Sequence, residues 1–155
     1  MRTTVKIEGL ADLDEALRSL PKSTSRSVLR SAGVIALKPV IEAAREYVPV
    51  DEGDLRDSLT VTTRLSRRQR RKEAKQDKEG KPTVQLYAGA AALPHAHLVE
   101  FGTSTMPAQP FLRPAWEREK LNVLKILGAQ LGIKIDKAVK RLARKAARLA
   151  AKNGK

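Results

Sequence analysis

One short cluster of side chains in this sequence could bind a metal ion: His95 and His97, with Glu100 three residues further on. Imidazole and carboxylate groups are common zinc ligands, and a metal held by three of them supports hydrolysis. The spacing argues against convergence, because on a helix His97 and Glu100 share a face that excludes His95, and on a strand the two histidines align without Glu100. We expect a surface or interface role for this cluster, without metal or cofactor, and keep a metal-dependent hydrolase as an alternative.

A second group of carboxylates surrounds Gly53 and consists of Asp51, Glu52, Asp54 and Asp57. It lacks the alternating ligands and the terminal glutamate of a calcium-binding EF-hand loop. We interpret residues 48–55 as a turn that redirects the chain into a strand. The sequence also contains no nucleophile elbow, no phosphate-cradling glycine loop and no dinucleotide-binding fingerprint. These observations predict that the protein is not an enzyme.

The net charge of +14 is concentrated in two segments of the 155-residue chain. Residues 64–81 contribute +6 and residues 134–155 contribute +8, so the rest of the chain is neutral overall. Basic segments of this kind are solvated or contact polyanions. The candidate polyanion contacts are Arg67, Arg68, Arg70, Arg71, Lys72, Arg141, Arg144, Lys145 and Arg148.

All five aromatic residues lie outside these two basic segments. Sequence-specific reading of nucleic acid is therefore not expected, because the segments carry no stacking groups and no recognition motif. Nonspecific contact with the phosphates of genomic DNA stays open. A nonspecific nucleic-acid-binding or packaging protein is accordingly the main alternative function.

The sequence contains no cysteine, which excludes disulfides and thiolate metal sites and fits a protein made in a reducing cytoplasm. Its N-terminus lacks the apolar core of a signal peptide, and no apolar run approaches the roughly 20 residues of a membrane span. We expect a soluble protein that is not exported and has no membrane partner.

Hydrophobic periodicity predicts three elements in the first 48 residues. Residues 3–8 alternate as in a short strand, and a helix capped by Asp12 carries leucines on one face until Pro21 ends it. Residues 22–48 then form the main core helix, with Pro39 as a kink or as the junction of two helices. Its expected core positions are Val28, Leu29, Ala32, Ile35, Ala36, Val40, Ala43 and Tyr47.

Two alternating segments, residues 59–65 and 84–88, predict an antiparallel hairpin. The intervening residues 66–82 are far longer than the two to five residues of an ordinary hairpin loop. The hairpin therefore carries a basic arm. This arm is either a solvated loop or a segment that becomes ordered on a neighbouring subunit or on nucleic acid.

The C-terminal third predicts a helical turn at residues 96–101 ended by Gly102, an extended segment at 103–110 and a long helix over 114–150. The expected helix seam is Leu121, Leu124, Gly128, Leu131, Ile135, Ala138, Leu142 and Leu149. Because such a helix would exceed about 50 Å, its distal half must pack on another chain or stand in water. Membrane-surface binding is a weaker option, since no aromatic residue follows Trp116.

These elements predict an α+β fold in which a small antiparallel sheet packs on a long kinked helix. We expect one domain over residues 1–116, with the arm of residues 66–82 inserted, and a basic helical extension over residues 117–155. Residues 99–115 combine aromatic anchors with turn formers and prolines, which is typical of an assembly segment. The expected interface residues are Phe101, Gly102, Thr103, Pro107, Pro110, Phe111, Leu112, Arg113, Pro114 and Trp116.

In order along the chain come a leucine helix after Gly9, a long alanine-rich helix that ends at Ala44 and Arg45, the turn of residues 48–59, and residues 98–103 followed by 107–115. Together these motifs resemble the tail-component family of long-tailed phages, whose type members are the tenth gene product of phage HK-ninety-seven and minor tail protein Z of lambda-like phages. The resemblance spans residues 9 to about 116. The basic arm and the cationic C-terminal extension depart from the family pattern.

The resemblance implies a structural virion protein of the phage neck, without catalysis or cofactor. It implies a ring, expected to be a hexamer, that joins the tail to the head and completes the tail. The implied partners are further copies of the chain and other neck and tail proteins, namely a stopper, a tail terminator and the tail tube.

Overall fold

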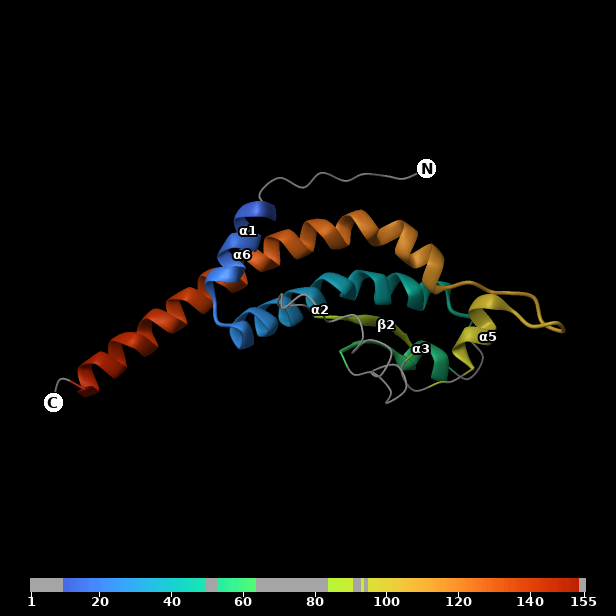
Figure 1. Cartoon of the computed structure of the whole chain (residues 1–155). Helices are drawn as coiled ribbons and strands as arrows, with labels where there is room; N and C mark the ends of the chain where they lie inside the picture. Colours follow the sequence, from blue (N-terminus) through green and yellow to red (C-terminus); the bar gives the residue numbers. More distant parts are fainter. Residues whose placement is uncertain (1–9, 50–52, 64–83, 91–92, 94, 154–155) are drawn as a thin grey trace.

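The computed structural model describes residues 10–49, 53–63, 84–90, 93 and 95–153 (Figure 1). The elements in chain order are α1 (Leu10–Ser19), α2 (Lys22–Tyr47), α3 (Asp54–Ser58), β1 (Leu59–Thr62), β2 (Tyr87–Ala90), α5 (Ala96–Phe101) and α6 (Leu112–Asn153). The fold is mostly helical with a small antiparallel sheet, which confirms the predicted α+β class. The expected strand at residues 3–8 and the basic arm at residues 66–82 lie outside the described residues.

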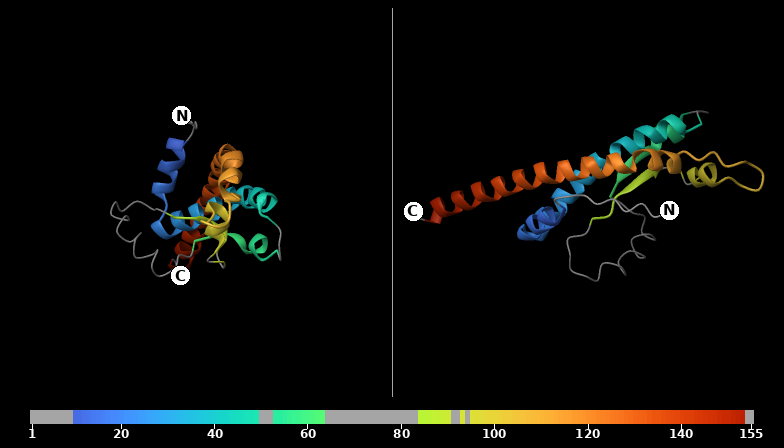
Figure 2. Two further views of the ribbon diagram at one scale, coloured as in Figure 1. Left: turned by 90° about the vertical axis from the view of Figure 1, so that its right-hand side faces the viewer. Right: turned by 90° about the horizontal axis from the view of Figure 1, so that it is seen from above.

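The two long helices, α2 and α6, lie side by side and form the body of the molecule (Figures 1 and 2). Small residues allow this close packing, since Ala32 and Ala36 of α2 and Ala115 of α6 are almost completely buried. The first core cluster, next to the sheet, consists of Ala36, Val40, Ile41, Ala43, Ala44, Val48, Leu59, Phe111, Ala115 and Val123. The second, beneath α1, consists of Leu17, Leu20, Val28, Ala32, Leu131, Ile135 and Ala138.

Most of the predicted core positions of α2 are confirmed. The buried faces differ from the prediction near the C-terminus of α2 and near the N-terminus of α6. Tyr47 of α2 and Leu121 of α6 are exposed, so their assignment to the core seams was wrong. The buried stripe of α2 ends on Ala44 and Val48, and that of α6 runs through Ala115 and Val123. Tyr47 and Val48 lie three and four residues after Ala44, so both fit the helical period. Only the position of the neighbouring helix decides which of the two is buried.

The connection between α1 and α2 depends on a buried serine. The hydroxyl group of Ser25 donates to the carbonyl oxygen of Leu17 at 2.7 Å, and the Leu20 amide donates to the same oxygen at 3.3 Å, so the end of α1 is tied to the start of α2. Helix α1 begins at Leu10, which places Asp12 within the first turn and corrects its expected role as the cap. Helix α2 ends at Tyr47, just before Pro49, as predicted.

The sheet is a two-stranded antiparallel pair with Leu59 opposite Ala90 and Thr62 opposite Tyr87. The predicted pairing is confirmed, but the second strand begins three residues later than the alternation of Val84 and Leu86 suggested. Leu86 instead packs on α2, where a side chain added at Gly33 would lie 2.1 Å from its Cδ1 atom. The guanidinium of Arg45 donates to the carbonyl oxygen of Leu59 at 3.1 Å and ties the sheet to α2.

Helix α2 continues as one helix through Pro39, so of the two expectations for this position the junction of two helices is wrong. Helix α6 is also continuous, as predicted, and runs through residues 116 and 117. With 42 residues, α6 is about 63 Å long. The side chains of residues 143–151 are exposed, and this part of the helix projects from the body (Figure 2). None of the helices in the described ranges is apolar enough over a sufficient length to cross a membrane.

Gly128 tests whether α6 packs as described, because it lies within this helix and a Cβ atom built there meets no atom within 4 Å. Gly128→Ala should raise the free energy of unfolding by about 0.5–1 kcal/mol, since alanine loses less backbone entropy in a helix. Urea denaturation followed by circular dichroism measures the change. A decrease would show that another surface packs closely against Gly128.

Candidate functional site

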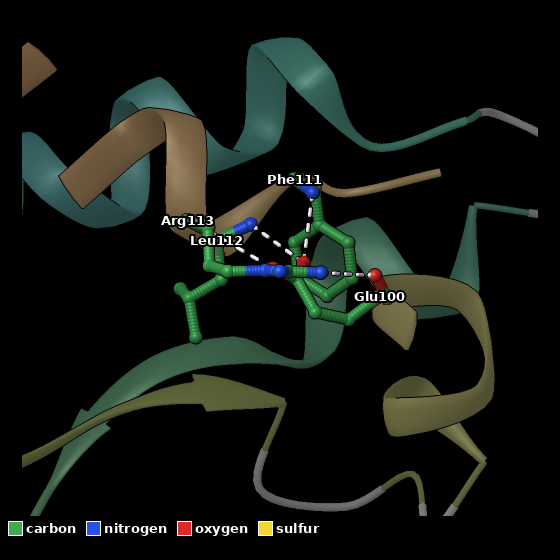
Figure 3. Close-up of polar contacts among 4 residues, drawn as sticks. All are labelled: Glu100, Phe111, Leu112 and Arg113. Atoms are coloured by element: carbon green, nitrogen blue, oxygen red, sulfur yellow. Dashed lines mark hydrogen bonds and ion pairs between the residues drawn. The ribbon is translucent and has the colours of Figure 1, made fainter. Parts of the chain in front are cut away.

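Helices α5 and α6 meet around the carboxylate of Glu100 (Figure 3). Glu100 is only 5% exposed, and its carboxylate accepts hydrogen bonds from three consecutive backbone amides at the start of α6. The distances are 2.8 Å to Phe111, 2.9 Å to Leu112 and 3.1 Å to Arg113. Glu100 is therefore the N-terminal cap of a helix that begins twelve residues after it in the sequence.

This cap satisfies the whole first turn of α6. An α-helix leaves its first four amide groups without partners inside the helix. In α6 these positions are Phe111, Leu112, Arg113 and Pro114. The first three donate to Glu100, and Pro114 has no amide hydrogen, so no donor is left without an acceptor.

Arg113 in turn donates hydrogen bonds to the C-terminal end of α5. Its Nε atom donates to the Glu100 carboxylate at 3.1 Å, and its Nη2 atom donates to the Glu100 backbone carbonyl at 3.2 Å. The amides of Gly102 and Gln109 satisfy the carbonyls of Leu98 and Val99, at 2.8 and 2.9 Å. A carboxylate thus lies at a helix N-terminus and a guanidinium at a helix C-terminus, and both placements oppose the helix dipoles.

The loop between the two helices, residues 102–110, is held by local contacts although residues 103–110 are all exposed. The Thr103 amide donates to the carbonyl of Met106 at 2.9 Å, and the Thr103 hydroxyl accepts from the Met106 amide at 3.0 Å. Gly102 has a φ of 75°, and a Cβ atom there would lie 2.8 Å from the Ala108 nitrogen. The loop therefore turns back on itself, which corrects the prediction of a simply extended segment.

Two opposing effects act on the Glu100 carboxyl. Burial by itself raises its pKa, but the amides of Leu112, Phe111 and Arg113 and the Arg113 side chain together lower the pKa below the ordinary value of 4.5. Hydrogen bonds to the charged form outweigh desolvation here. The cap is therefore ionised at neutral pH.

The predicted interface residues fall into three groups in the structure: exposed, partly buried and buried. Phe101 is 66% exposed, with its ring 4.9 Å from the Arg113 guanidinium carbon, and Trp116 is 44% exposed. Thr103, Pro107 and Pro110 are also exposed, whereas Gly102, Leu112 and Pro114 are partly buried. Phe111 is only 3% exposed and belongs to the first core cluster, so its role as a docking anchor is corrected to one in folding.

An apolar hollow lies beside Trp116, between α2, α6 and the β2 side of the molecule. Its volume is about 510 Å³. The apolar residues that line it are Leu37, Val40, Leu86, Ala88, Leu112 and Trp116. Two of these residues, Leu112 and Trp116, come shortly after the loop of residues 102–110 in the sequence.

The candidate polyanion contacts are only partly described. Arg141, Arg144, Lys145 and Arg148 are exposed on the distal half of α6, at the opposite end of the molecule from the loop (Figure 1). Arg67, Arg68, Arg70, Arg71 and Lys72 lie outside the described residues.

The candidate metal cluster has a different structural use. His95 and His97 are exposed, while Glu100 is buried in the cap, and the described part of the chain holds no group of three or more potential metal ligands. Sequence reasoning missed the role of Glu100, because a cap eleven to thirteen residues from its donors follows no local spacing rule. Its signal was weak: one carboxylate within a short helical turn that ends before Gly102, a few residues before the start of a long helix.

The fold and this site define a small helical scaffold that holds an exposed, hydrogen-bonded loop between two helix ends. A family model described as bacteriophage HK97-gp10-like tail component matches residues 11–102. The chain belongs to this family of phage tail components, which is generally structural. No curated protein and no solved structure matches the chain. The matched region ends at Gly102, so Glu100 lies within it and the helix that it caps lies outside.

Removal of the cap should destabilise the fold. Glu100→Ala leaves buried amides without an acceptor and should lower the free energy of unfolding by about 2–3 kcal/mol. Urea denaturation at pH 7 measures the loss. Glu46→Gln is the matched control, because Glu46 forms a solvent-exposed ion pair with Arg118 and such pairs contribute little to stability. Equal effects of the two variants would contradict the capping role.

The lowered pKa of Glu100 also predicts a pH dependence. The unfolded state takes up the proton first on acidification, so the stabilisation by Glu100 is fully present above pH 4.5 and is lost as pH falls through the lower folded pKa. The difference in unfolding free energy between the wild type and Glu100→Gln should be constant from pH 7 to 5.5 and shrink below pH 4.5. A carboxyl titration followed by carbon NMR should give a pKa below 4.5, and a value above 4.5 would contradict the geometry.

Proposed function

We propose that this chain is a structural protein of the phage neck and upper tail that forms a ring, expected to be a hexamer, and joins the tail to the head. Family membership supports a tail component, and the rigid exposed loop of residues 102–110 is the observation that carries the assembly role. In the virion the ring would contact a stopper, a tail terminator or the tail tube.

The loop has the properties of a pre-organised contact. Its backbone is constrained by the Glu100 cap, by Thr103 and by Pro107 and Pro110, so docking costs little conformational entropy. Phe101 and Met106 expose apolar surface on and next to it. Large apolar groups of this kind are typical anchors of protein interfaces.

The same chain offers an apolar surface that could receive the loop of a neighbour. The hollow beside Trp116 is distinct from the loop, so an interaction between them would be heterologous, with a different surface on each partner. Heterologous contacts generate closed rings when their rotation closes. The proposed interface therefore pairs Phe101 and Met106 of one subunit with the hollow around Trp116 of the next.

Native mass spectrometry of the full chain, alone and mixed with tail proteins, tests the proposal. The wild type should give one discrete oligomer, and Phe101→Ser combined with Met106→Ser should reduce it at least tenfold, because the anchors are lost. Trp116→Ser should have a similar effect from the receiving side.

Leu149→Ser is the matched control, because Leu149 is 52% exposed but lies near the far end of α6. It should leave the oligomer unchanged. Only monomer under all conditions would refute the ring, and equal losses in the control and in the loop variant would refute the proposed interface.

A further inference from the structure

The distal half of α6 carries a continuous basic stripe that the proposed ring contacts do not use. The stripe consists of Lys134, Lys137, Lys140, Arg141, Arg144, Lys145 and Arg148. All except the partly buried Lys134 are exposed. We propose that this stripe binds the phosphate backbone of double-stranded nucleic acid without reading its sequence.

The stripe occupies one side of the helix. With 3.6 residues per turn, the seven cations fall within an arc of about 140°. The adjoining face, centred about 120° away, carries Leu131, Ile135 and Ala138, which are buried in the second core cluster. Packing on the body therefore orients α6 so that its cations face outward together.

The spacing of the charges matches a nucleic-acid strand. Lys134 and Arg148 are separated by about 21 Å along the helix axis, which gives one cation every 3.5 Å or so. Duplex DNA carries one phosphate per strand for about each 3.4 Å of its axis. A helix lying along one strand would therefore meet a comparable density of opposite charge.

The stripe is not neutralised within the described chain. Asp136 is the one acidic residue between positions 134 and 153, and the ion pairs found among the described residues involve none of the seven cations. Many of these cations are three or four positions apart, where like charges repel on a helix. A polyanion would relieve this repulsion.

Other ligands fit the stripe less well. Helix α6 has no aromatic residue after Trp116, so it offers neither stacking groups for single-stranded bases nor interfacial anchors for a membrane. Between positions 134 and 152 it also has no asparagine or glutamine that could read base edges. Nonspecific duplex binding requires only the cations that are present.

Fluorescence anisotropy with two labelled 25-base-pair duplexes of unrelated sequence tests the inference on the full chain. The wild type should bind both equally, with affinity that falls steeply between 50 and 200 mM salt. The combined substitutions Arg141→Gln, Arg144→Gln and Arg148→Gln should weaken binding roughly tenfold or more and reduce the salt slope by two to three.

The matched control removes the same charge from α2 through Arg26→Gln, Arg30→Gln and Lys38→Gln, which replace three exposed cations. It should bind nearly as the wild type does. Equal losses in both triple variants, or no loss in the α6 variant, would overturn the inference. Tighter binding to phosphatidylglycerol vesicles or to polyglutamate than to duplex at the same salt would also overturn it. Native mass spectrometry of the α6 variant should show the same oligomer as the wild type. A loss of duplex binding can then be distinguished from a failure of ring assembly.

Discussion

The carboxylate of Glu100 is the contact on which the arrangement of this molecule depends. It joins the last turn of α5 to the first turn of α6 through three backbone hydrogen bonds, while Arg113 binds back to α5. A buried charge is costly unless it is fully hydrogen-bonded, and here the donors are fixed by a helix that cannot rotate them away. The position of the α6 N-terminus follows from this contact, and so does the path of the loop between the two helices.

From that start α6 extends about 63 Å, first across the α2 surface and then beyond it. This length places the exposed loop of residues 102–110 and the distal half of α6 at opposite ends of the protein (Figure 2). One end presents a constrained loop with exposed apolar groups, and the other presents a basic helix face. Because they lie at opposite ends of one rigid element, protein contacts and polyanion contacts could occur without competition. The family match covers the part that ends at Gly102, so the long helix is the portion in which this chain extends past the matched region.

Local patterns predicted the elements well where the signal is carried by neighbours in the chain. Helices α1 and α2 each end two residues before a proline, Pro21 and Pro49. Helix α5 ends just before Gly102, whose positive φ favours glycine. Two predictions that depended on a distant partner failed. Phe111 resembled an interface anchor but fills the core, and Tyr47 matched the helical period but faces solvent.

The helices, the antiparallel pair, the segregation of charge and the family resemblance could all be predicted from the sequence alone. Each depends on the spacing or the composition of residues that are near one another in the chain. Tertiary structure decided what the polar residues do. Glu100 looked like a metal ligand or a surface group until its distance from Phe111, Leu112 and Arg113 was known. Its donors are backbone amides, which every sequence has, so no pattern of side chains could reveal which carboxylate would meet them. Only the packing of α6 on α2 brings that particular helix end to that particular glutamate.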